Sequence, residues 1–468
     1  MQDMTKEKQI AIDAIETKAE VITSVAKKIW EFAELSLQEF QSCALYCEVL
    51  EKEGFQVAKG ICGIETAFSA SYGSGKPVIG ILAEYDALSG LSQVAGSLER
   101  QEITAGGTGH GCGHNLLGAG ALAAAIGVKA FLQETGQQGT VILYGCPGEE
   151  GGAAKAFMAR DGIWKNLDAA LTWHPEDCNE VVTGSSNSCI QVQYHFTGVA
   201  SHAAGAPEKG RSALDAVELM NIGVQFLREH MPSSARIHYA ITDTGGISPN
   251  IVQAHASALY QIRAPYAPEL ASLYERVNNI ARGAALMTDT KVEIKFLKGT
   301  SNTLLLPALD EIMYKNMCEI HNPVEDASDM DFAFEIVKTQ KDPNSIGDSA
   351  FNIKPYPWNK AGNIPLPGSS DVGDVSWVCP VTQCGTSTWP KGTAAHSWQA
   401  VSCGKSDFAH RGMLFAGEII AATAVDIFNN PEVIEKAWSQ HREKTGGQPY
   451  VCPIPKEITP AELEAETT

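Results

Sequence analysis

The sequence lacks several features that would assign it to a membrane, secreted or redox class of protein. No stretch approaches the ~20 consecutive apolar residues of a membrane span, and residues 1–28 are charged and helix-patterned, unlike a secretory signal peptide. The 12 cysteines form no C-x-x-C pair, and neither an H-E-x-x-H nor a G-x-S-x-G motif occurs. We therefore expect a cytoplasmic protein with free thiols and no disulfide framework.

The sequence is also poor in positive charge. Its 35 basic and 55 acidic residues give a net charge of −20, which argues against nucleic acid or an anionic membrane as a partner. An apolar content of 44% with 19% charged residues is typical of a globular protein. An anionic substrate would need a local basic feature to offset the negative field of the whole chain.

The order of predicted elements indicates an α/β fold. A chain of 468 residues exceeds one ordinary hydrophobic core, so at least two domains are expected. Strands that alternate with helices predict a mostly parallel sheet, and the continuous apolar run at 77–83 is typical of a strand buried on both faces. The predicted strands lie at 64–71, 77–83, 140–146 and 168–173, and the predicted helices lie within 6–53 and at about 115–134, 152–160 and 406–428.

The pattern changes near residue 188. From there the predicted order is strand, helix, strand, strand, helix, strand, which is the order of a ferredoxin-like α+β unit. These elements are expected at 190–197, 211–230, 235–242, 254–263, 268–286 and 291–297. We therefore expect residues 188–302 to form an inserted segment, and residues 1–187 and 303–468 to form the two parts of the larger α/β domain.

The most informative run is His-Gly-Cys-Gly-His-Asn at 110–115. Cys112 and His114 are good ligands for a borderline transition metal. Two residues apart, they cannot share a helix face, where neighbours are three or four apart, but a glycine-rich loop lets them converge on one ion. Taken alone, Cys112 is more often a buried small side chain and His114 a hydrogen-bonded structural histidine than a ligand, so the metal hypothesis depends on further ligands.

Further polar residues follow the predicted strands, at the edge where α/β sheets build their sites. They are Asp86, the pair Glu149 and Glu150, His174 and, in a loop of small residues, His396. Singly, each has a structural explanation, since acids are favoured at helix N-termini and loop histidines are common. Together they indicate two close divalent ions that share a bridging ligand and a water. One carboxylate of the Glu149–Glu150 pair would bind metal, and the other would accept the water's proton.

These motifs resemble peptidase family M20, in the branch that has a Cys-Gly-His metal motif and includes auxin-conjugate hydrolases. The resemblance covers almost the whole chain, and the set of motifs is more specific for the family than for a substrate. The motifs are GHGCGHNL (109–116), PGEEGG (147–152), TWHP (172–175), SHAAGAP (201–207), GRSALDAVELMN (210–221), GGISPNIVQAHASALYQIRAP (245–265) and SSDVGDVSW (369–377).

The resemblance implies five metal ligands, with the cysteine as the bridge between two divalent ions. They are Cys112, His114, Glu150, His174 and His396. It also implies Glu149 as the general base that later returns its proton to the leaving amine. Asp86 matches an acidic position of the family, and we expect it to orient a ligand histidine. Many members carry Asp after the second ligand, where this chain has Asn115, but the nearest subgroup resembles this chain, so no ligand is counted as lost.

The inserted segment resembles the lid and dimerisation domain of the family. His202 is then expected to stabilise the tetrahedral oxyanion, in many members at the partner's site. Asn250 and Arg263 are expected to hold the substrate's carboxylate or carbonyl. The planar guanidinium of Arg263 suits bidentate binding of a carboxylate, but the sequence alone favours an ordinary solvated arginine, so this assignment rests on the family resemblance.

The activity implied by the resemblance is metal-dependent hydrolysis of an N-acyl or N-aroyl amino acid, with p-aminobenzoyl-glutamate, a compound of folate catabolism, as the expected substrate. The alternatives are a general aminoacylase or dipeptidase, or a non-catalytic partner subunit, which should lack a ligand or the base. Two ions in each copy of the chain are expected, manganese or zinc, with cobalt or nickel also compatible. The expected partner is a second copy bound through the lid, or a related A-type subunit.

Overall fold

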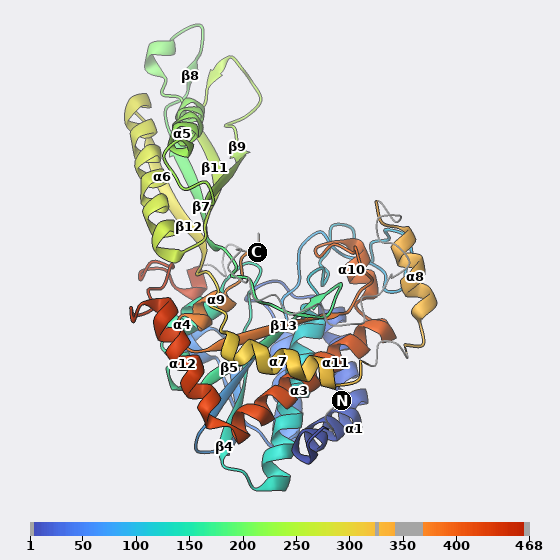
Figure 1. Cartoon of the computed structure of the whole chain (residues 1–468). Helices are drawn as coiled ribbons and strands as arrows, with labels where there is room; N and C mark the ends of the chain where they lie inside the picture. The colour runs from blue at the N-terminus through green and yellow to red at the C-terminus, as the bar shows by residue number, and fades with distance from the viewer. Residues whose placement is uncertain (1–3, 323–326, 342–367, 463–468) are drawn as a thin grey trace.

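The fold consists of a main body and a smaller projecting lobe (Figure 1). The computed structural model describes residues 4–322, 327–341 and 368–462. The main body is formed by both ends of the chain, and the lobe is formed by residues of the inserted segment.

A seven-stranded sheet lies at the centre of the main body, in the order β1-β2-β4-β3-β5-β13-β6. Its inner strands β4, β3, β5 and β13 are parallel neighbours, and antiparallel pairs occur only towards the two edges. This confirms the predicted mainly parallel sheet. The strands are β1 (Gln56–Lys59), β2 (Phe68–Ser74), β3 (Val78–Ala83), β4 (Gly139–Gly145), β5 (Ala169–Glu176), β6 (Glu180–Val181) and β13 (Val381–Ser387).

Two long core helices cover this sheet. α3 (His114–Thr135) packs against α1 (Lys6–Phe32) and α11 (Asp407–Asn429) and contacts β3, β4 and β5. By length and composition α3 and α11 could each cross a membrane, but 89% and 83% of their most apolar windows are buried inside the protein. The remaining helices of the main body are α2 (Phe40–Lys52), α4 (Ala154–Arg160), α7 (Pro307–Glu319), α8 (Met330–Lys338), α9 (Val372–Ser376), α10 (Trp398–Cys403) and α12 (Pro431–Thr445), with short 3-10 turns at Ile61–Gly63 and Ile163–Asn166.

The inserted segment contains an antiparallel four-stranded sheet in the order β12-β7-β11-β9. Both of its helices pack on this sheet (Figure 1), and β9 is an edge strand. Its elements are β7 (Ser188–Thr197), β8 (Ser201–His202), α5 (Ala213–Arg228), β9 (Arg236–Asp243), β10 (Ile251–Val252), β11 (His255–Ala264), α6 (Ala267–Thr288) and β12 (Lys291–Thr300), with a 3-10 turn at Pro207–Lys209.

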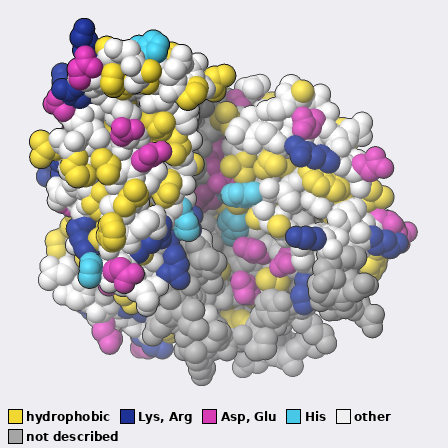
Figure 2. Space-filling model, turned by 90° about the horizontal axis from the view of Figure 1, so that it is seen from above, with side chains coloured by type: hydrophobic (Ala, Val, Ile, Leu, Met, Phe, Trp, Pro, Cys, Tyr) yellow, Lys and Arg dark blue, Asp and Glu magenta, His cyan; other side chains and the backbone are white. Residues whose placement is uncertain are grey.

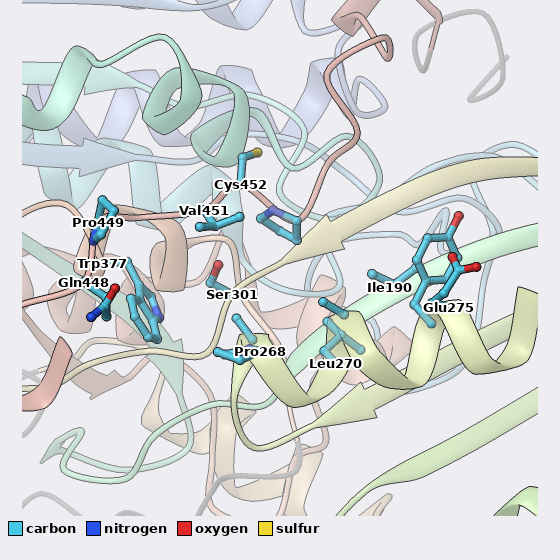
Figure 3. A pocket seen from close by; sticks show the side chains of 14 residues that line it. Ile190, Pro268, Leu270, Glu275, Ser301, Trp377, Gln448, Pro449, Val451 and Cys452 are labelled. Carbon is cyan, nitrogen blue, oxygen red and sulfur yellow. The ribbon is translucent and has the colours of Figure 1, made fainter. Parts of the chain in front are cut away.

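Two hollows separate the inserted segment from the main body. Viewed from above, the cleft between the two lobes has histidine and acidic side chains on its walls (Figure 2). A second, apolar cavity of about 520 Å³ lies where α6 meets the segment 448–453. Pro268 and Leu270 of α6 face Trp377 and Val451 across this cavity (Figure 3). None of the predicted metal ligands lines it.

Glu418 is a buried acid in the core helix α11, and we predict that it makes the stability of the protein depend on pH. Its side chain is 6% exposed, and burial, with a smaller effect of Glu16, raises its pKa to about 8. A raised carboxyl pKa means that the folded state favours the protonated form, so stability falls as pH rises from the unfolded pKa towards pH 8.

Thermal unfolding of wild type and Glu418→Gln should therefore diverge with pH. The variant should gain roughly 3–4 kcal/mol relative to wild type between about pH 5 and pH 8, because glutamine does not ionise. An exposed acid on α1 provides the control, since Glu20→Gln should follow the wild-type curve. Parallel curves for wild type and Glu418→Gln would show that Glu418 is not held protonated.

Candidate metal centre

The turn before α3 brings Cys112 and His114 to the same side of the main sheet. Gly113 caps α3 in the left-handed region, with φ 74°. A Cβ atom at this position would lie 2.9 Å from Pro175 Cβ and from a ring atom of Trp389, so only glycine fits both the conformation and the space. Cys112 is 8% exposed and His114 is fully buried. Because Cys112 lies in a tight turn and not in the helix, its side chain can approach that of His114, which a spacing of two residues within a helix would prevent.

Three groups of candidate metal ligands lie close together in the described residues, and two of these clusters share Cys112. The first of these two consists of Cys112, His114 and His174, whose candidate ligand atoms lie within 4.8 Å of one another. Cys112 Sγ is 3.4 Å from His174 Nε2. His174 Nδ1 donates to the carbonyl of Pro175 at 2.8 Å, which leaves Nε2 of the neutral ring with its lone pair towards the sulfur. One thiolate and two imidazoles form a donor set that suits zinc and similar ions.

The second cluster also contains Cys112, together with Glu150 and His396, again with all ligand atoms within 4.8 Å. Glu150 Oε1 lies 3.2 Å from His396 Nε2. His396 has φ 59°, a conformation that costs a non-glycine residue about 1–3 kcal/mol. Its N–H donates to the carbonyl of Gly111 at 2.8 Å, which ties its loop to the turn that carries Cys112. The sulfur of Cys112 is thus common to both clusters.

Asp86 connects one residue of each cluster. One of its oxygens accepts from His114 Nδ1 at 2.9 Å, and the other accepts from the N–H of Glu150 at 2.8 Å. Ser36 adds a further contact, since its hydroxyl donates to Asp86 at 2.8 Å and accepts from the N–H of Gly151 at 2.9 Å. Such contacts fix the tautomer and orientation of a ligand histidine.

A metal ion would satisfy the buried donor atoms of the clusters better than their hydrogen bonds to one another do. His114 Nε2 is buried and has no hydrogen-bond partner, and its neighbour Glu84 Oε2 is 3.3 Å away. Buried polar atoms without partners are rare and call for an explanation. Here a divalent cation would satisfy the Nε2 lone pair, because Asp86 already accepts from the other ring nitrogen.

The electrostatics of the clusters also favour a cation. Burial opposes ionisation of the Cys112 thiol, but His174 and His114 outweigh this effect and lower its pKa to about 7. Hydrogen bonding to Cys112 and then to Glu150 raises the pKa of His396 to about 10. A surplus of negative groups therefore surrounds these imidazoles, and divalent ions bound to thiolate, carboxylate and imidazole would neutralise it.

Glu149 and Glu150 point in different directions although they are adjacent in the chain. Glu150 belongs to the cluster of Cys112 and His396, whereas Glu149 lies with Glu84 and His114. The Glu149 side chain is buried, and burial raises the pKa of its carboxyl group. This environment is typical of a carboxylate that accepts and returns a proton, since a general base needs a pKa nearer to neutrality.

The structure adds a buried charged group that sequence reasoning missed. Lys155 Nζ lies 2.6 Å from Glu84 and 2.5 Å from Asp371, and all three side chains are buried. Asp371 also accepts from the N–H of Lys155 at 3.0 Å. A paired buried lysine neutralises carboxylates that would otherwise repel Glu149. The available signals were a charged residue within the apolar run AAKAFMA and a second acid in AEYDAL.

Two of the three candidates of the inserted segment, His202 and Asn250, lie at the end of that segment away from the main body. His202 in β8 and Asn250, next to β10, lie on a small two-stranded sheet at the end of the inserted segment farthest from the main sheet (Figure 1). Ala203 N–H donates to the carbonyl of Asn250 at 3.0 Å. Arg263 is near the other end, where it pairs with Cys189 of β7. Within the described residues, the Cys112 clusters therefore consist of main-body side chains alone.

Comparison with known proteins shows which family the chain is similar to. Residues 80–455 match the model of peptidase family M20/M25/M40. The chain is 45% identical to the B subunit of p-aminobenzoyl-glutamate hydrolase from Escherichia coli, over 97% of this chain and 98% of that protein. The A subunit of the same Escherichia coli hydrolase is 29% identical over 40% of this chain and 44% of its own length.

A solved structure shares the fold. The Bacillus subtilis YXEP protein, described as a dinuclear metal binding peptidase from the M20 family, superimposes with a TM-score of 0.57 at 17% identity. The superposition covers 89% of this chain and 99% of that chain. At this identity the likeness concerns the arrangement of elements, which agrees with the mainly parallel sheet of the main body.

Proposed function

The chain belongs to peptidase family M20/M25/M40, and from this premise we propose that it hydrolyses p-aminobenzoyl-glutamate to p-aminobenzoate and glutamate. It is a metal-dependent amidohydrolase. The observation that carries the proposal is the pair of donor clusters that meet at Cys112 beside the buried Glu149. The substrate follows from the near full-length similarity to a hydrolase of that compound.

The donor sets support two divalent ions in each copy of the chain, one in each cluster. Cys112 would bind both, His114 and His174 would complete one set, and Glu150 and His396 would complete the other. Manganese or zinc suits these mixed nitrogen, oxygen and sulfur ligands, and cobalt or nickel is also compatible. When bound, such ions polarise the amide carbonyl and lower the pKa of a water molecule.

The proton transfers are assigned to Glu149. Its carboxylate accepts a proton from the attacking water, and the oxygen of that water forms the new bond to the amide carbon. The C–N bond then breaks, and the same carboxyl group returns the proton to the departing nitrogen of glutamate. Asp86 keeps His114 and the backbone of Glu150 in place during both steps, through the two hydrogen bonds described above.

Residues of the inserted segment complete the proposed site. His202 is assigned to the oxyanion, and Asn250 and Arg263 are assigned to the substrate's carboxylate or carbonyl groups. Since β8, which carries His202 and pairs with β10 next to Asn250, lies far from α3, which follows Cys112 (Figure 1), these two residues would act after closure of the inserted segment, as a lid, or on the site of a second copy.

The inserted segment offers a suitable docking edge for a partner. The outer strand β9 leaves Tyr239 and Ile241 41% and 42% exposed, and an open sheet edge is a template for pairing with another strand. We propose a dimer through this segment, with either a second copy or an A-type subunit, because related A and B subunits of p-aminobenzoyl-glutamate hydrolase exist. Light scattering of the purified chain would contradict the homodimer if it gave the mass of a monomer.

A substrate panel tests the proposed function. The protein, loaded in turn with manganese and zinc, should show a higher kcat/KM for p-aminobenzoyl-glutamate than for N-acetyl amino acids or dipeptides. A gap of roughly 10–200-fold is expected for pocket selectivity of this kind. A preference for dipeptides or N-acetyl amino acids would replace this substrate with a general aminoacylase or dipeptidase activity. If the purified chain hydrolysed none of these compounds by itself and became active only after addition of an A-type subunit, the result would favour the partner-subunit role.

A further inference from the structure

Lys298 of strand β12 reaches from the inserted segment to the turn that carries Glu149 and Glu150. Its ammonium donates to the backbone carbonyl of Glu149 and, at 3.0 Å, to that of Glu150. These two residues stand almost 150 positions earlier in the chain. The contact therefore joins the inserted segment to the backbone of the proposed base and of a metal ligand.

A bulge in β12 is the reason that Lys298 points towards this turn. Lys295 pairs with Gln193 and Lys298 pairs with Gln191, so three residues of β12 span two residues of β7. Cross-strand partners share a face, and faces alternate along a strand. Without the bulge, Lys298 would lie on the face opposite to Lys295, but with it the two lysines share a face. Bulges next to active sites commonly re-aim a side chain in this way.

The peptide group between Glu149 and Glu150 is held from two sides. Its N–H donates to Asp86 at 2.8 Å, and its C=O accepts from Lys298. The neighbouring N–H groups of the turn also have side-chain partners in the main body, since Gly148 donates to Glu39 and Gly151 donates to Ser36. The carbonyls of Glu149 and Glu150 are bound by the inserted segment, through Lys298.

We infer that Lys298 is a positioning residue for the reaction: it fixes the peptide plane from which Glu149 and Glu150 diverge, and so couples the seating of the inserted segment to the placement of base and ligand. Rotation of this peptide would turn both side chains together, away from their separate clusters. The inference deepens the proposed function, and the expected effect of Lys298 on turnover rests on that proposed function. The structural coupling itself does not depend on the identity of the substrate.

Hydrogen exchange of the metal-free protein tests the coupling without any assay of activity. In Lys298→Met the amides of residues 148–153 should exchange about tenfold faster than in wild type. The free energy of local opening is smaller in the variant, because opening of the turn does not have to break the Lys298 contacts. Lys298→Arg, which keeps a cationic donor, should restore most of the protection. Lys291→Met is the matched control, since Lys291 is an exposed lysine of the same strand, and it should leave this turn unchanged.

Kinetics of the metal-loaded protein give the second readout. Lys298→Met should lower kcat by roughly 10–100-fold, the usual effect of removing a partner that orients a metal site, with KM within about twofold of wild type. If the turn of Lys298→Met exchanges like that of wild type, the inference is overturned whatever the turnover. A wild-type protein that hydrolyses none of the substrates would refute the proposed function, while the exchange measurement would still decide the coupling.

Discussion

Substitution of Glu149 by glutamine should reduce kcat by about 10²–10⁴-fold, the range that general acid–base catalysis contributes. Glutamine keeps the size of the side chain and a carbonyl oxygen, but it cannot take the proton of the attacking water. The loss should appear in kcat and kcat/KM equally, because the proton transfer belongs to the transition state. Steady-state kinetics with p-aminobenzoyl-glutamate over a range of concentrations would measure both parameters.

The metal content of this variant separates a lost base from a lost ion. Glu149 belongs to neither of the two clusters that share Cys112, so elemental analysis of Glu149→Gln should give the same ions per chain as wild type. Glu65→Gln, which changes an exposed acid, should keep both activity and metal. A Glu149→Gln protein with full metal and wild-type turnover would refute the assignment of Glu149 as the base.

The sequence predicts best those helices and strands whose own pattern of apolar and polar residues determines their secondary structure. The sequence predicts a helix at about 115–134, and α3 runs from His114 to Thr135, because a long apolar run bounded by glycines has few other solutions. β13, a central strand, was missed because it reads VTQCGTS and carries many polar side chains. Thr382 and Thr386 of β13 are buried only because Asp310 and the carbonyl of Gly412 accept their hydrogen bonds. Such partners are remote in the sequence and leave no periodic signal.

The same distinction applies to the candidate site. The sequence identifies the metal-ligand candidates because each stands in a short motif, and Glu150 and His174 lie at strand ends, where α/β sheets place their sites. The pairing of Lys155 with Asp371 spans 216 residues, and the contact of Lys298 depends on a bulge. Neither relation can be inferred from local spacing, because both follow from how distant elements are stacked. Lys155 and Lys298, whose partners are distant in the sequence, were therefore harder to predict than the metal-ligand candidates.

The removal of the shared sulfur should have a larger effect than the removal of any other single ligand. One cluster also contains His114 and His174, and the other also contains Glu150 and His396, so Cys112 is the one residue that they share in the described part of the chain. Cys112→Ala should therefore weaken the binding of both ions. Metal ions contribute several kcal/mol to stabilisation of the transition state, and each 1.36 kcal/mol is a factor of ten in rate. We therefore expect turnover to fall by about 10³-fold or more, with substoichiometric metal after dialysis.

Comparison with ligands that belong to one cluster tests whether the sulfur is a bridge. His174→Ala and His396→Ala each remove a donor from a single cluster, so each should lose about one ion and retain the other. Cys318→Ser, which changes an exposed free thiol, should retain wild-type metal and activity. If Cys112→Ala lost only as much metal as His174→Ala, the sulfur would serve one ion, and Glu150 and His396 would need a different third ligand. If Cys112→Ala lost both ions while His174→Ala and His396→Ala each kept one, a bridging thiolate would account for all three results. Within the described residues, no other side chain belongs to both donor sets.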